Sequence, residues 1–102
     1  MTQFETWLNK VNEKRKSQWE QRYENLPYEP LTYTKGRKYI KILGNRSVWG
    51  FVSMWEGVNK GSVVKKGDLL LAAGRNQPAK HSRGNIFEGT DQWDMFGPSY
   101  LI

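Results

Sequence analysis

The stretch SVWGFVSMW, residues 47–55, constrains the fold more than any other part of the sequence. Alternate side chains of a strand point to opposite faces of a sheet. Both alternating sets of this stretch are largely apolar: Val48, Gly50, Val52 and Met54 on one face, and Trp49, Phe51, Ser53 and Trp55 on the other. We therefore expect a strand that is covered on both faces. Gly50 within it would allow a bulge or a sharp bend.

A helix is expected at the N-terminus, over residues 2–25. Thr2 followed by Glu5 is a capping box, in which each residue satisfies a backbone N–H of the other. The apolar side chains of one face then recur at helical spacing: Phe4, Trp7, Leu8 and Val11. Asn25 and Pro27 end the pattern. We expect this helix to cover one face of the central strand.

The remainder of the chain reads as β-rich after a short stiff connector, PYEP, at residues 27–30. Short apolar or β-branched runs alternate with turn signals, which predicts strands at residues 31–34, 38–43, 47–55, 62–64 and 69–73. The predicted fold is α+β, with the N-terminal helix (1–26) packed on a small antiparallel β-barrel or strongly bent sheet. We expect one domain, 1–102, in which the apolar C-terminal segment packs back on the β-rich part (31–102).

Several protein classes are disfavoured by composition. The chain has no cysteine, so it forms neither a disulfide framework nor a thiolate zinc site. It has no apolar run of about 18 residues that could span a membrane, and its first residues lack the order of a signal peptide. We expect a cytoplasmic protein without a cofactor. The sequence leaves the oligomeric state open.

Charge is strongly segregated along the chain. Residues 1–30 carry equal numbers of acidic and basic side chains, so the net charge of +6 belongs to the remainder. Within it, residues 35–83 hold eleven bases against Glu56 and Asp68, whereas residues 84–102 have three acids and no base. A field of this kind attracts polyanions such as nucleic acid. The alternative is that the charge only keeps a small protein soluble.

Two basic stretches are the candidate nucleic-acid site. YTKGRKYIK, residues 33–41, interleaves cations with aromatic rings, as single-stranded nucleic acid requires. GRNQPAKHSRGN, residues 74–85, contains glycine and proline and few apolar groups, which predicts an exposed loop. The candidate contacts are Lys35, Arg37, Lys38, Tyr39, Lys41, Arg75, Lys80, His81 and Arg83. In the alternative, Tyr33 and Tyr39 are core residues and the lysines protect a sheet edge from aggregation.

Catalysis is poorly supported, and we expect no enzyme. His81 is the one histidine, so a two-histidine site for RNA cleavage is excluded. Glu88, Asp91 and Asp94 are close enough in sequence to bind a divalent ion, but a solvated acidic turn is the favoured interpretation. No phosphate-binding loop or zinc-protease motif occurs. We assign no catalytic and no metal-binding residue.

Tryptophan provides the alternative hypothesis, which is contact with another protein. Trp7, Trp49 and Trp93 are expected in the core. Trp19 and Trp55 are flanked by polar or glycine positions and are expected to be more exposed, and exposed tryptophan is a common interface anchor. Trp19, Tyr23 and Trp55 would then bind a partner enzyme directly, such as a toxin, nuclease or polymerase, and inhibit or modulate it.

The run KKGDLLLAAGRNQPAKHSRGNIFEG, residues 65–89, is followed by WDMFGPSYL. It resembles small uncharacterised accessory proteins of large tailed bacteriophages, over roughly residues 38–101 and chiefly in PAKHSRGNIF. The resemblance implies expression in the bacterial cytoplasm during infection, and binding to nucleic acid or to a host enzyme. It carries over no catalytic residue.

Overall fold

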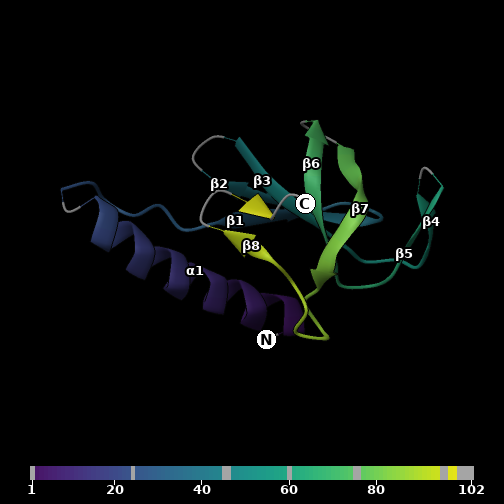
Figure 1. The fold of residues 1–102 in the computed structure, drawn as a ribbon, viewed down its shortest axis with the longest axis horizontal. Coiled ribbons are helices and arrows are strands. Elements are labelled where there is room, and N and C mark those ends of the chain that lie inside the picture. The colour runs from purple at the N-terminus through teal and green to yellow at the C-terminus, as the bar shows by residue number, and fades with distance from the viewer. Residues whose placement is uncertain are drawn as a thin grey trace.

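The computed structural model describes residues 2–23, 25–44, 47–59, 61–74, 77–94 and 97–98. One helix, α1 (Gln3–Arg22), precedes the β-rich part of the chain (Figure 1). The strands are β1 (Thr32–Lys35), β2 (Tyr39–Gly44), β3 (Ser47–Ser53), β4 (Gly57–Asn59), β5 (Ser62–Val64), β6 (Asp68–Gly74), β7 (Gln77–Asn85), β8 (Trp93–Asp94) and β9 (Gly97–Pro98). In these ranges no helix is both long and apolar enough to cross a membrane.

Helix α1 begins with the predicted capping box. The Thr2 side chain accepts a hydrogen bond from the Glu5 N–H at 3.1 Å, and the Glu5 carboxylate accepts one from the Thr2 N–H at 3.2 Å. This backbone hydrogen bond from Thr2 is the main cause that lowers the pKa of Glu5. The helix ends earlier than predicted, at Arg22, where the N–H of the C-cap residue Tyr23 still donates to the Trp19 carbonyl.

Five strands form an antiparallel sheet in the order β1-β2-β3-β6-β7. The α+β class is therefore confirmed, with one helix on an antiparallel sheet. Of the two expected forms, a small barrel or a strongly bent sheet, a closed barrel is not found, because the described residues include no pairing between β1 and β7, and both are edges of the sheet. Figure 1 shows α1 running across one side of the sheet.

The main core lies between α1 and the sheet. Phe4, Leu8 and Val11 of the helix pack against a cluster that includes Ile42 and Leu69, both of which are fully buried. Trp49 is buried, and Trp7 and Trp93 are partly buried against the same cluster, as the sequence predicted.

Strand β3 is covered on both faces, as its sequence indicated. Val52 is 1% exposed and its neighbour Phe51 is 3% exposed, although alternation points the two side chains in opposite directions. Gly50 lies beside a register shift between Ile42 and Leu43. A Cβ at Gly50 would lie 2.8 Å from the ring of Pro98, so this glycine lets the C-terminal segment pack closely on β3.

The prediction of an exposed loop at residues 74–85 is wrong. This stretch contains the end of β6 and the whole of β7. Pro78 pairs with Ala72, which an edge strand tolerates because the missing proline N–H has no further strand to bond. The β6–β7 ladder also contains three register shifts, at which the regular pairing is locally disrupted.

A buried network of side-chain hydrogen bonds fixes the turn at the end of β7. The Asn85 side chain donates to the Lys66 carbonyl at 2.8 Å and to Asp68 at 3.1 Å, and it accepts from the N–H groups of Phe87 and Glu88. Asn85 and Asp68 are each only 3% exposed. These bonds give the asparagine of the PAKHSRGNIF string a structural role.

Two further short hairpins complete the described chain. β4, which was not predicted, pairs with β5 in an arm that projects beyond the sheet (Figure 1). Val58 and Val63 face each other across this arm and are 63% and 75% exposed. β8 pairs with β9, and Pro98 is buried, so this part of the C-terminal segment packs back as expected. The apolar residues 95, 96 and 100–102 lie outside the described residues.

Candidate nucleic-acid interface

The β1–β2 hairpin gathers the first set of predicted basic residues at one end of the sheet. Its turn is closed by the Gly36 N–H, which donates to the Tyr39 carbonyl at 2.9 Å. Lys35, Arg37 and Lys38 are exposed, and they form no ion pair with any residue that the structure describes. We call these three cations, with Tyr39 and Lys41, the basic hairpin.

The basic hairpin borders a hollow of about 290 Å³, lined by Thr34, Lys35, Gly36, Arg37, Lys38, Tyr39, Lys41 and Phe51. Tyr39 and Lys41 lie on one face of β2, whereas Ile40 is buried on the helix side, as alternation predicted. The half-buried Tyr39 ring meets the buried Phe51 ring edge-on, with centroids 6.3 Å apart. The hollow therefore combines an aromatic lining with a cationic rim.

Trp55 lies at the same end of the sheet as the basic hairpin. The Lys38 ammonium lies 4.3 Å from the centroid of the Trp55 ring, and the Met54 N–H donates to the Lys38 carbonyl at 2.7 Å. A Cβ at Gly57 would overlap the Trp55 indole, so glycine leaves room for this ring position. Trp55 was predicted as an anchor for a partner protein, but its half-buried ring contacts a basic residue of the predicted nucleic-acid site.

The second basic set lies elsewhere. Gly74 and Gln77, which flank Arg75, are at the opposite end of the sheet from Lys38, and Arg75 itself lies outside the described residues. Lys80 and His81 belong to β7, although their side chains also lie outside the description. Arg83 is half-buried. Three strand spacings, about 14 Å in a flat sheet, separate β2 from β7 in the strand order.

The structure thus does not build one groove from both basic sets. Phe51 and Trp55 complete the basic hairpin instead, and sequence reasoning did not include Phe51. The available signal was the hairpin pairing of β2 with β3, which places Lys41 opposite Phe51 and Tyr39 opposite Ser53.

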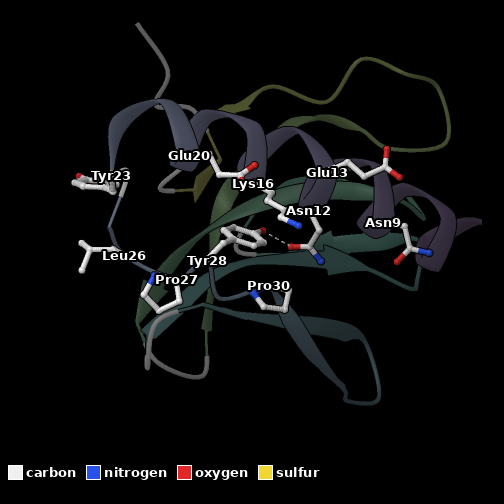
Figure 2. A pocket seen from close by; sticks show the side chains of 10 residues that line it. All are labelled: Asn9, Asn12, Glu13, Lys16, Glu20, Tyr23, Leu26, Pro27, Tyr28 and Pro30. Carbon is white, nitrogen blue, oxygen red and sulfur yellow. Dashed lines mark hydrogen bonds between the residues drawn. The ribbon is translucent and has the colours of Figure 1, made fainter.

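A larger groove runs between α1 and the connector. It has a volume of about 640 Å³ and is lined by Asn9, Asn12, Glu13, Lys16, Glu20, Tyr23, Leu26, Pro27, Tyr28 and Pro30. Figure 2 shows the polar side chains of α1 forming one wall and the tyrosine and proline side chains of the connector forming the other. Leu26 is 56% exposed at one end of the groove. The Trp19 and Tyr23 rings contact each other at a tilt of 47°, with centroids 4.5 Å apart, and the Trp19 indole N–H donates to the Leu26 carbonyl.

A polar network holds this groove in shape. Arg15 is 3% exposed and donates to the Tyr28 hydroxyl at 2.9 Å. That hydroxyl donates to the Asn12 side chain at 2.6 Å, the bond drawn as a dashed line in Figure 2. Asn12 also bonds both the N–H and the carbonyl of Leu31. Burial is the main cause that raises the pKa of Tyr28, and the positive charge of Arg15 opposes it.

The acidic C-terminal residues have structural partners. The Asp91 carboxylate accepts hydrogen bonds from the indole N–H groups of Trp7, at 2.9 Å, and Trp93, at 3.0 Å. Glu88 pairs with Lys65 at 3.3 Å on the surface. The Asp94 side chain lies outside the description, and the side chains within it include no group of three that could hold a metal ion.

Comparison of the chain with protein-family models, with curated proteins and with solved structures found no match. Function therefore has to be inferred from the residues and their geometry.

Proposed function

We propose that the protein is a non-enzymatic nucleic-acid-binding accessory protein, with RNA favoured slightly over DNA. The observation that carries this proposal is the basic hairpin. Lys35, Arg37 and Lys38 are exposed around one hollow without an ion pair to any described residue. Cations placed in this way are free to exchange their counterions for phosphates.

The chemistry of the basic hairpin supports phosphate contacts rather than base-specific recognition. Lysine provides a mobile point charge, and the arginine fork binds phosphate oxygens with two parallel hydrogen bonds. Contacts of this type fix the position of a nucleic acid without reading its sequence. The basic residues Lys80 and Arg83 of β7 add positive charge at the other edge of the sheet.

The test is a fluorescence-anisotropy titration against single-stranded RNA, single-stranded DNA and duplex DNA at several salt concentrations. We expect log K to fall as log salt rises. Replacing Lys35, Arg37 and Lys38 together by alanine should make the plot of log K against log salt less steep for single strands. The magnitude of its slope should fall by about 2, because each lost phosphate contact contributes about 0.7. A matched variant, in which Lys10, Lys14 and Lys16 of α1 become alanine, removes the same charge and should retain the slope. Absence of binding at low salt would contradict the proposal.

A second candidate function is contact with a partner protein, and the groove beside α1 favours it. The groove has an exposed leucine at one end, half-buried tyrosines, and the carboxylates of Glu13 and Glu20 against the single cation Lys16. The proposed occupant is an extended segment of a host enzyme that carries a basic side chain. Grooves lined by aromatic side chains commonly bind extended segments.

This second function is tested with a photo-crosslinking side chain at position 26, in nuclease-treated bacterial lysate. One host enzyme should be crosslinked, and Glu20→Lys should abolish the product by reversing the charge of the groove wall. The same crosslinker at the exposed Gln21 serves as the control. Equal crosslinking at positions 21 and 26, or insensitivity to Glu20→Lys, would exclude the groove as the contact.

A further inference from the structure

We infer that the hollow of the basic hairpin takes an unpaired base, so that the protein selects single-stranded over duplex nucleic acid. This inference rests on the proposed function and adds the structural class of the ligand to it.

The lining of the hollow is the first argument. Tyr39 is half-buried and lines the hollow together with Phe51, and the edge-on contact between the two rings holds the tyrosine in place. Phe51 is 3% exposed and is fixed in the most deeply packed strand. A base that stacks on an aromatic ring gains affinity whatever its identity, because every base has a flat π face.

The size of the hollow is the second argument. Its volume of about 290 Å³ lies just below the range of about 300–1,000 Å³ for small-molecule sites, so it suits one ring system rather than a stacked base pair. In a duplex the flat faces of the bases are covered by their neighbours, and a duplex reaches only the cations at the rim. An unpaired base is free to turn out of the strand and stack on a side chain.

The rim provides the third argument. Lys35, Arg37 and Lys38 surround the hollow, so the phosphates on either side of an inserted base would meet positive charge. Lys38 is held over the Trp55 ring at 4.3 Å, and its carbonyl is bonded by the Met54 N–H. A cation that is already ordered loses less conformational freedom on binding.

The experiment uses three probes of one sequence: a single-stranded RNA of six nucleotides, the same strand with one central abasic position, and the duplex. Tyr39→Leu should weaken binding of the intact strand by about 5- to 100-fold, which corresponds to one lost base stack. It should leave duplex binding and the salt slope unchanged. The abasic strand should bind the wild-type protein as weakly as the intact strand binds the Tyr39→Leu variant.

Tyr39→Phe keeps a stacking ring and should bind like the wild type, which separates stacking from any effect of Tyr39→Leu on the fold. Tyr23→Leu, in the distant groove, serves as the control. If the duplex binds as tightly as the strand, or if the abasic strand binds as tightly as the intact one, base insertion is wrong while phosphate binding stands. If none of the three probes binds, the proposed function itself fails, and the inference with it.

Discussion

At the residue scale, the Asn85 side chain connects two segments that are distant in sequence, residues 66–68 and residues 85–88. It bonds the turn before β6 through Lys66, the first residue of β6 through Asp68, and the turn after β7 through Phe87 and Glu88. Only an amide side chain offers donors and an acceptor together in this geometry. A buried site of this kind tolerates substitution poorly, because the partners would be left without hydrogen bonds.

We predict that Asn85→Ala lowers the free energy of unfolding by about 2–4 kcal/mol, because a buried polar group left unsatisfied costs roughly 1–3 kcal/mol and several partners are affected. Urea unfolding measures this change. Gln92→Ala, at a nearby exposed position, should change stability by less than about 0.5 kcal/mol. A loss at Asn85 no larger than that of the control would show that water replaces the amide there.

Tyr28 makes stability depend on alkaline pH. Burial raises its pKa above the ordinary value of 10.0, so the folded protein keeps the phenolic proton at a pH where the unfolded chain releases it. The stabilisation is complete below about pH 10 and is lost as the pH rises through the folded pKa. Urea unfolding between pH 8 and 11 should show a steeper loss of stability in the wild type than in Tyr28→Phe. Parallel curves would show that Tyr28 titrates alike in both states.

At the element scale, the sequence predicts local patterns well and tertiary pairings poorly. The capping box and apolar stripe of α1, and the alternation in β2 and β3, are encoded by neighbouring residues. β7 could not be predicted, because proline and glycine interrupt it and it lacks an apolar period. Its pairing depends on β6 beside it and on its edge position, where Pro78 needs no outward N–H.

The attachment of α1 to the C-terminal segment depends on Asp91. Asp91→Ala leaves two part-buried indole N–H groups without this acceptor, and should lower the free energy of unfolding by about 1–3 kcal/mol. Asp91→Asn keeps an acceptor oxygen but loses the charge, so its effect should be smaller. Thermal unfolding of both variants tests the order, and equal losses would mean that charge, rather than hydrogen bonding, holds the helix there.

At the scale of the whole molecule, the two basic sets lie on opposite edges of the sheet. The residues of the basic hairpin could be predicted because they are contiguous in YTKGRKYIK. The aromatic partners of this hairpin could not, since Phe51 and Trp55 reach it only through strand pairing and a turn. The relative position of the two basic sets could not be predicted, because glycine and proline in residues 74–85 do not indicate which sheet edge the segment occupies.

This separation predicts a dependence on ligand length. With a strand of six nucleotides, replacing Arg75, Lys80 and Arg83 together by alanine should leave affinity nearly unchanged, because a short ligand occupies only the basic hairpin. With a strand of thirty nucleotides, the same variant should bind more weakly and with a lower salt slope. Anisotropy titrations with both lengths provide the measurement. A large loss with the short strand would place one or more of these three residues in the primary site.

The hydrogen bond from Trp7 to Asp91 joins residues 84 positions apart. During synthesis on the ribosome, α1 emerges before its acceptor Asp91 and before much of the sheet that buries Phe4 and Leu8. At the usual speed of translation, about 5–20 residues per second, the apolar face of the nascent helix stays exposed for several seconds before the sheet that buries it is made. Chaperone contact with this helix is therefore expected before the chain is completed, and rapid folding begins only once β6 and β7 have left the exit tunnel.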